Sequence, residues 1–250
     1  MGLPSFFENN MKGTLMDKMA HTLKIGKYNT RRMCSRCGYV FPTDNSVTMA
    51  DHKRATKHQE TYVMDVDEKI VEIVSMLTQK GYAIKSSCQG GWPDYITEVN
   101  LEGGKYEQKT KEVKPSAKHK GTPKKLIINF KMNPSSSLKT RKNIPDELIK
   151  KYEENYWKWI GIMIETLPNA FYASFYYETN STTLPRSIIR QPNPRVRNLV
   201  ISWTSDMSPR ALGSDEEFDT MVAYSYKKLK EWAEELPNIN DVLHIKDAEE

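Results

Sequence analysis

The chain has 250 residues, 38% of them hydrophobic and 28% charged, which is enough for one sizeable core and a small appended module. No apolar run approaches the roughly 20 residues of a membrane span, the N-terminus lacks the regions of a signal peptide, and three cysteines do not indicate a disulfide framework. The composition therefore argues against membrane-spanning and disulfide-rich secreted proteins and favours a cytoplasmic one. The net charge of +5 is uneven, because residues 105–142 carry about +10 and the remainder about −5.

The first half of the chain alternates helical and extended patterns. Apolar residues at helical spacing predict an N-terminal amphipathic helix within residues 1–27. A second helix, Asp65–Lys80, is predicted from a capping box of Asp65 and Glu68 and from Gly81 at its C-terminus. Strands are expected over residues 82–87 and 95–101, joined by the Gly- and Pro-rich turn CQGGWPD.

The second half repeats this alternation with longer helices. Residues 103–125 are basic and aperiodic, which predicts an exposed loop, and a strand is expected over 125–132. A helix over 145–167 follows, then strands over 171–179 and 198–205, then a helix that begins at a capping box of Ser214 and Glu217. Strands in runs between three long helices predict an α+β fold with an antiparallel or mixed sheet over residues 61–240, and a frayed tail over 241–250.

Two cysteines and two histidines are concentrated between residues 34 and 58. Their spacing, Cys-x2-Cys-x14-His-x5-His, supplies the two thiolates and two imidazoles of a closed tetrahedral zinc site. Gly38 follows the cysteine pair, and Phe41 and Met49 are placed to cover the metal. The sequence therefore predicts a zinc finger over residues 28–60 with Zn²⁺ as cofactor; its expected ligands are Cys34, Cys37, His52 and His58. A free cysteine pair in a turn, beside two surface histidines, is the structural alternative.

Residues Tyr28–Gln59, and DHKRATKHQ in particular, resemble the matrin-type or JAZ-type branch of two-Cys/two-His fingers. The resemblance implies nucleic-acid binding, RNA or DNA, through basic residues between the histidines. Other fingers bind proteins, so a role as a host-protein interaction factor stays open. The residues expected to contact phosphates, including those of the basic loop, are Arg31, Arg32, Lys53, Arg54, Lys57, Lys118, Lys120, Lys124 and Lys125.

The run from Val66 to Val99 has a second resemblance, carried by SSCQGG at the end of a strand. It is similar to small uncharacterised proteins of bacteriophages and bacteria, with a strand ending S-C-x-G-H, and to the wybutosine-synthesis methyltransferase-like family, with S-S-C-x-G-R. Gly91 stands where these have His or Arg. The resemblance implies a phage protein, or a nucleotide or small-molecule pocket for group transfer or ligand sequestration; its residues are Ser86, Ser87, Cys88, Gln89, Gly90 and Trp92.

Two further points bear on function. No histidine lies near Cys88 in sequence, and no catalytic acid/base pair or triad can be named, so no enzymatic activity is inferred. The aromatic residues of the 145–167 helix could stack on bases, but their helical spacing favours the core, with Trp157 expected off the main apolar face. The leading interpretation is a zinc-binding, nucleic-acid-binding accessory protein.

Overall fold

The computed structural model describes residues 21–56, 62–102, 105–112, 123–132, 146–177, 181–182 and 196–239. The fold is α+β, as predicted, and every strand pairing in these residues is antiparallel. The chain divides into two compact units. We call Met1–Asn29 with Trp92–Lys124 the hairpin unit, and Thr30–Gly91 with Lys125–Glu250 the main unit.

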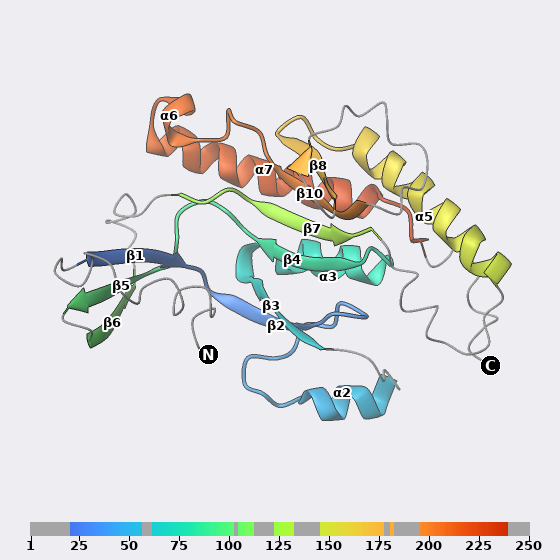
Figure 1. Ribbon diagram of the computed structural model, residues 1–250, viewed down its shortest axis with the longest axis horizontal. Coiled ribbons are helices and arrows are strands. Elements are labelled where there is room, and N and C mark those ends of the chain that lie inside the picture. Colours follow the sequence, from blue (N-terminus) through green and yellow to red (C-terminus); the bar gives the residue numbers. More distant parts are fainter. Residues whose placement is uncertain are drawn as a thin grey trace, which may run out of the picture. The chain divides into compact units, whose positions relative to one another are not determined.

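The hairpin unit contains a three-stranded sheet in the order β1-β5-β6 (Figure 1). Its strands are β1 (His21–Lys27), β5 (Tyr95–Glu102) and β6 (Lys105–Glu112). Residues 21–27 are therefore a strand, where a helix was predicted, because β5 offers them a full ladder of backbone partners. Residues 1–20 of that predicted helix lie outside the described residues. Likewise, residues 105–112 of the predicted basic loop form a strand, in which residues 108–112 are exposed.

The main unit is built on a five-stranded sheet in the order β4-β7-β10-β8-β9 (Figure 1). The strands are β4 (Ile84–Cys88), β7 (Ile127–Lys131), β8 (Phe171–Tyr177), β9 (Ser181–Thr182) and β10 (Val196–Trp203). All five strand regions predicted after residue 81 are thus confirmed as strands, but β4 and β5, expected as neighbours, belong to different sheets. The chain passes from the main unit to the hairpin unit within CQGGWPD, so this loop does not close a hairpin.

Helices cover one face of this sheet. Helix α5 (Asp146–Glu165) places Trp157 parallel to Phe175, with ring centroids 6.4 Å apart. Helix α7 (Asp215–Glu235) places Ser225 at the Trp203 ring nitrogen, which donates a hydrogen bond of 3.1 Å to the serine hydroxyl. Trp157 is buried, so the prediction that it lies off the apolar face is wrong. The buried face of α5 is wider than the spacing of its apolar residues in the sequence suggested.

A two-stranded ribbon of β2 (Thr30–Cys34) and β3 (Val63–Asp67) packs with helix α3 (Val71–Gln79). The 3₁₀ turn η2 (Glu68–Ile70) connects β3 to α3. The predicted capping box at Asp65 and Glu68 is absent from these described residues, because Asp65 belongs to strand β3, where it lies opposite Arg32 of β2 in the backbone register. Gly81 does end the helical segment with a positive φ of 92°, as expected.

The last helices are capped as the sequence indicates. Ser208 caps the short α6 (Pro209–Leu212), and the Ser214 hydroxyl accepts a 3.2 Å hydrogen bond from the Glu217 amide at the start of α7. At the other end of α7, the Lys80 ammonium donates to the carbonyl oxygens of Ala233 and Leu236. In the described part of the chain, two helices exceed 15 residues, α5 with 20 and α7 with 21, and none is long and apolar enough to cross a membrane.

Candidate metal centre

The cysteine pair lies in a tight turn at the end of β2. The Cys34 amide donates to the Tyr39 carbonyl at 2.8 Å, and the Gly38 amide donates to the Cys34 carbonyl at 3.0 Å. Gly38 has a φ of 73°, a conformation that only glycine adopts without strain. Below the turn, Met33 and Val40 form an isolated bridge. The backbone thus folds back on itself and brings the Cys34 and Cys37 side chains to one side.

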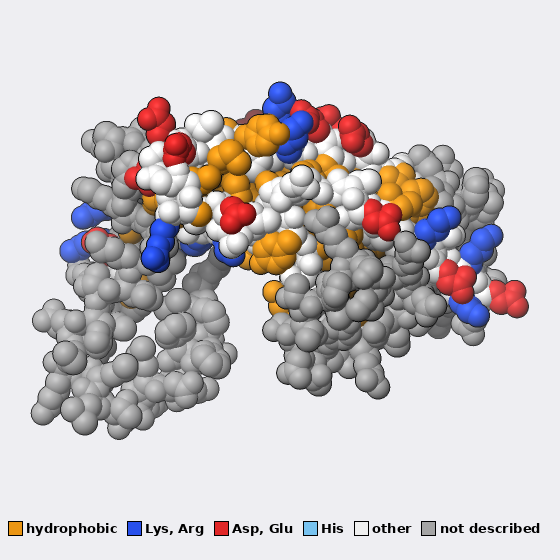
Figure 2. Space-filling model, turned by 90° about the horizontal axis from the view of Figure 1, so that it is seen from above, with side chains coloured by type: hydrophobic (Ala, Val, Ile, Leu, Met, Phe, Trp, Pro, Cys, Tyr) orange, Lys and Arg blue, Asp and Glu red, His pale blue; other side chains and the backbone are white. Residues whose placement is uncertain are grey.

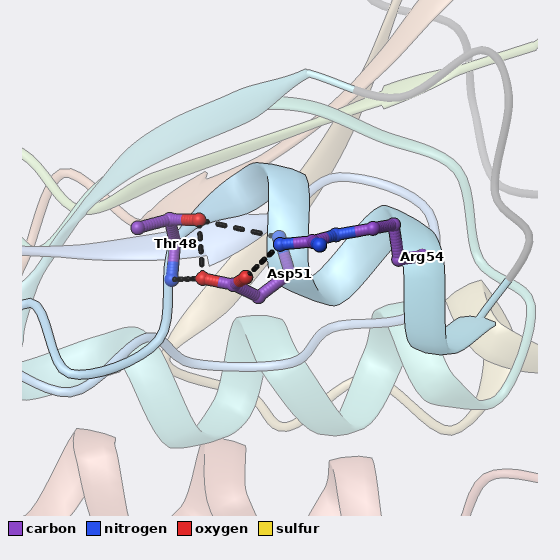
Figure 3. Close-up of polar contacts among 3 residues, drawn as sticks. All are labelled: Thr48, Asp51 and Arg54. Atoms are coloured by element: carbon purple, nitrogen blue, oxygen red, sulfur yellow. Dashed lines mark hydrogen bonds and ion pairs between the residues drawn. The ribbon is translucent and has the colours of Figure 1, made fainter.

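Helix α2 (Met49–Thr56) supplies the histidine. Figure 3 shows how its N-terminus is fixed: the Thr48 hydroxyl accepts from the Asp51 amide at 3.2 Å, and the Asp51 carboxylate accepts from the Thr48 amide at 3.0 Å. Arg54 pairs with the second oxygen of the Asp51 carboxylate. This reciprocal cap satisfies amide groups that the first turn of a helix leaves free, and these bonds lower the pKa of Asp51. His52, one residue further along, is buried.

Two aromatic side chains hold the His52 ring. Tyr39 stacks on it with a centroid distance of 4.9 Å and an interplanar angle of 15°. Phe41 meets it edge-on at 5.5 Å, and Tyr39 and Phe41 also contact each other. The prediction that Phe41 lies over the site agrees with this arrangement. Tyr39 was not singled out, although an aromatic residue two positions after a cysteine pair is a usable signal.

Cys34, Cys37 and His52 form the cluster that could hold a metal ion. Their ligand atoms all lie within 4.8 Å of one another, and the Cys37 sulfur is 3.4 Å from the His52 Nε2 atom. Burial raises the pKa of the Cys37 thiol, and a backbone hydrogen bond at Tyr39 opposes that shift. The fourth predicted ligand, His58, lies outside the described residues.

The turn is bonded to the core of the main unit. The Ser75 hydroxyl on α3 donates to the Gly38 carbonyl at 2.7 Å, and a Cβ atom at Gly38 would overlap the Ser75 carbonyl oxygen. Tyr62, just before β3, accepts a 3.1 Å hydrogen bond at its carbonyl from the Ser35 amide. Residues 30–56, predicted as part of a separate finger, therefore share one compact unit with the five-stranded sheet.

The predicted phosphate contacts occupy several environments. Arg31 donates to the Phe41 carbonyl at 3.5 Å, and Arg32 donates to Asn45 and lies 5.9 Å from the Phe41 ring centroid. These two arginines thus contact residues Phe41 and Asn45, which follow the cysteine pair. Lys53 and Arg54 follow His52 on α2, with Arg54 exposed and Lys53 half-buried.

The lysines of the basic segment divide between the two units. Lys124, in the hairpin unit, donates to the Gly26 carbonyl and lies 5.4 Å from the Tyr28 ring centroid. Lys125, in the main unit, lies 5.9 Å from the ring centroid of Tyr172. Lys57, Lys118 and Lys120 lie outside the described residues.

The predicted ligand pocket is divided between the two units, since Ser86–Gly90 belong to the main unit and Trp92 to the hairpin unit. Gln89 bonds to three elements. Its backbone amide donates to the Asp67 carboxylate at 2.8 Å, and its side-chain oxygen accepts from the Lys69 backbone amide. Its backbone carbonyl accepts from the Tyr226 hydroxyl. The Gly90 backbone packs against Leu126 and Trp203, where a Cβ atom would clash. These contacts give the segment a structural role; the small-molecule alternative stays a hypothesis.

No protein-family model matches the chain, and no curated protein or solved structure matches it either. The chemistry of the Cys34, Cys37 and His52 cluster is therefore the strongest functional indication in the described residues.

Proposed function

We propose that the protein is a zinc-stabilised, nucleic-acid-binding accessory protein. The observation that carries the proposal is the cluster of buried Cys34 and His52 with half-buried Cys37, positioned by a cysteine turn and a capped helix. The zinc closes the turn onto α2, and the basic residues that surround it contact the phosphate backbone.

The donor set favours zinc. Two thiolates and an imidazole are borderline-soft ligands that suit Zn²⁺ rather than the oxygen-preferring Mg²⁺ or Ca²⁺. In a tetrahedral zinc site, bond lengths of about 2.3 Å to sulfur and 2.0 Å to nitrogen separate a sulfur from a nitrogen by about 3.5 Å. The Cys37–His52 separation of 3.4 Å is close to this value. His58, two residues after the end of α2 at Thr56, is the proposed fourth ligand.

The charge around the cluster supports nucleic-acid binding. Lys53 and Arg54 follow the buried ligand His52 on α2, and the Arg54 side chain is 78% exposed. Its ion pair with Asp51 lies at the surface, where such pairs contribute little, so the guanidinium can exchange that carboxylate for a phosphate. Arg32, on the adjoining strand, is exposed as well.

The remaining described basic residues are dispersed. Lys109 and Lys111 are exposed on β6, Lys124 is exposed in the hairpin unit, and Lys125 is exposed in the main unit. On the face that Figure 2 shows, the described Lys and Arg side chains are spread among polar and apolar ones rather than gathered into one patch. We therefore expect several separate phosphate contacts and a moderate affinity.

Salt dependence tests the proposal. Fluorescence anisotropy with a labelled RNA or DNA should show an affinity that falls steeply as salt rises, because phosphate contacts release condensed counterions. The variant Lys53→Gln/Arg54→Gln should weaken binding and reduce the slope of log K against log salt by about 2. A matched control, Lys227→Gln/Lys230→Gln, removes two charges from α7 and should leave the slope unchanged. An affinity that does not depend on salt would refute phosphate binding.

A further inference from the structure

The five-stranded sheet has a second face, opposite to α5 and α7. We call it the outer face: it consists of alternate residues from Ile127 to Lys131 of β7, Asn198 to Ser202 of β10 and Tyr172 to Tyr176 of β8, with Ser86 and Cys88 of β4. The opposite set includes Ile128, Phe130 and Leu199, which are fully buried. One face of the sheet thus forms the core. On the other face the small Ser174 and Ser202 are buried, whereas the larger Tyr172, Tyr176 and Ile127 are exposed.

The outer face is unusual in what it exposes. Tyr172, Tyr176 and Ile127 are 36%, 40% and 38% exposed, and they are three of the six exposed large apolar side chains in the described part of the chain. Not one position of the outer face, as defined by these strands, carries a carboxylate; the other side chains are hydroxyls, amides, a valine, a cysteine and a lysine. An anion would meet no like charge from the strands themselves.

Lysines lie beside the aromatic rings. The Lys125 ammonium is 5.9 Å from the ring centroid of Tyr172. The strand register places Tyr176 opposite Asn198, and Asn198 opposite Lys131, so that Tyr176 and Lys131 lie in one row across three strands. The Lys131 ammonium is in turn 5.7 Å from the ring centroid of Tyr62.

Tyr62 connects this row to the metal-binding turn. It is 47% exposed, and its backbone bonds to Ser35, between the two cysteine ligands. Two ring–ammonium pairs, Lys125 with Tyr172 and Lys131 with Tyr62, therefore lie within the main unit, and Tyr176 lies in the row of Lys131.

We propose that the outer face binds single-stranded nucleic acid, with bases stacked on Tyr172 and Tyr176 and phosphates held by Lys125 and Lys131. Rings exposed beside cations grip single strands because every base has a stacking face, whereas the bases of a duplex are already stacked on each other. The two tyrosines, four residues apart on β8, are separated by about 13 Å, which a few nucleotides can span. This inference rests on the proposed nucleic-acid-binding function and names the class of nucleic acid and a second contact surface.

The test compares the full-length protein with Tyr172→Ala/Tyr176→Ala in an anisotropy titration with labelled oligo(dT) and oligo(U) of 12 nucleotides. Loss of two stacked bases should weaken binding by about 30-fold or more, taking the lower end of the usual stacking energy for each. Tyr172→Phe/Tyr176→Phe should bind as the wild type does, because phenylalanine keeps the ring. Tyr224→Ala is the matched control: Tyr224 is 51% exposed and has the Lys228 ammonium 5.8 Å from its ring, but it lies on α7.

The outcomes separate the two proposals. Weaker binding in the double alanine variant only, with an unchanged thermal melt, supports the inference. Wild-type affinity in that variant overturns it, yet leaves phosphate binding around the metal centre intact; an outer face that covers another protein would give this result. If the double alanine variant does not fold, Lys125→Gln/Lys131→Gln replaces it, with the same loss expected and unchanged binding counting against the inference. No binding by the wild type at low salt refutes the nucleic-acid function itself.

Discussion

Replacing Gly38 by alanine tests how firmly the turn of Cys34 and Cys37 is fixed to the core. Gly38 has a positive φ of 73°, and its carbonyl accepts the Ser75 hydroxyl of α3. An added Cβ would overlap the Ser75 carbonyl oxygen and lie 3.1 Å from the carbonyl carbon and 3.2 Å from Gln79 Cγ. The backbone atoms of a helix cannot move aside as the end of a flexible side chain can.

The cost has two parts. A non-glycine residue in the left-handed region costs about 1–2 kcal/mol, and overpacking against a rigid neighbour costs about 1–3 kcal/mol. Gly38→Ala should therefore lower the free energy of unfolding by about 2–5 kcal/mol. Gly213→Ala is the control, because Gly213 also has a positive φ of 82° but would meet only the end of the Glu217 side chain, at 3.3 Å. It should lose about 1–2 kcal/mol.

Guanidinium unfolding followed by tryptophan fluorescence measures both variants, since four of the five tryptophans lie in the main unit. A competition titration with a chromophoric chelator should show weaker zinc binding for Gly38→Ala and wild-type binding for Gly213→Ala. Equal losses of stability in the two variants would refute the claim that the turn packs tightly on α3.

Two further substitutions test contacts that hold the site and the core. Ser225→Ala removes the hydroxyl that accepts from the buried Trp203 ring nitrogen, and should destabilise the protein by about 1–3 kcal/mol; a change below about 0.5 kcal/mol would show that the bond is dispensable. Thr48→Ala removes the cap of α2 and should cost about 1 kcal/mol and weaken zinc binding, because α2 positions His52. A chelator titration indistinguishable from the wild type would contradict that link.

Local signals in the sequence predicted much of the main unit. The cap at Ser214 and Glu217 formed as expected, because both partners lie within one turn of α7. The pairing of Cys34 and Cys37 with His52 was predictable for a similar reason, since a short segment brings the three together. Their arrangement needs one turn, one capped helix and two aromatic side chains.

Features that depend on distant residues were not predictable. Residues 21–27 were included in a helix predicted from the spacing of apolar residues. Backbone pairing with β5, more than 60 residues away in the sequence, makes them a strand. Asp65 and Glu68 have the spacing of a helix cap, but Asp65 lies within strand β3, which pairs with β2. The burial of Trp157 depends on Phe175, on a strand that follows the helix. In each case, a tertiary contact outweighed a local preference.

Metal content is the most direct test of the central claim. Mass spectrometry of the purified protein should find one zinc per chain, and Cys34→Ser/Cys37→Ser should abolish it. Cys88→Ser is the matched control, because Cys88 lies on β4, outside the cluster, and it should keep the zinc. A wild-type protein without zinc, or a Cys34→Ser/Cys37→Ser variant that retains it, would contradict the account.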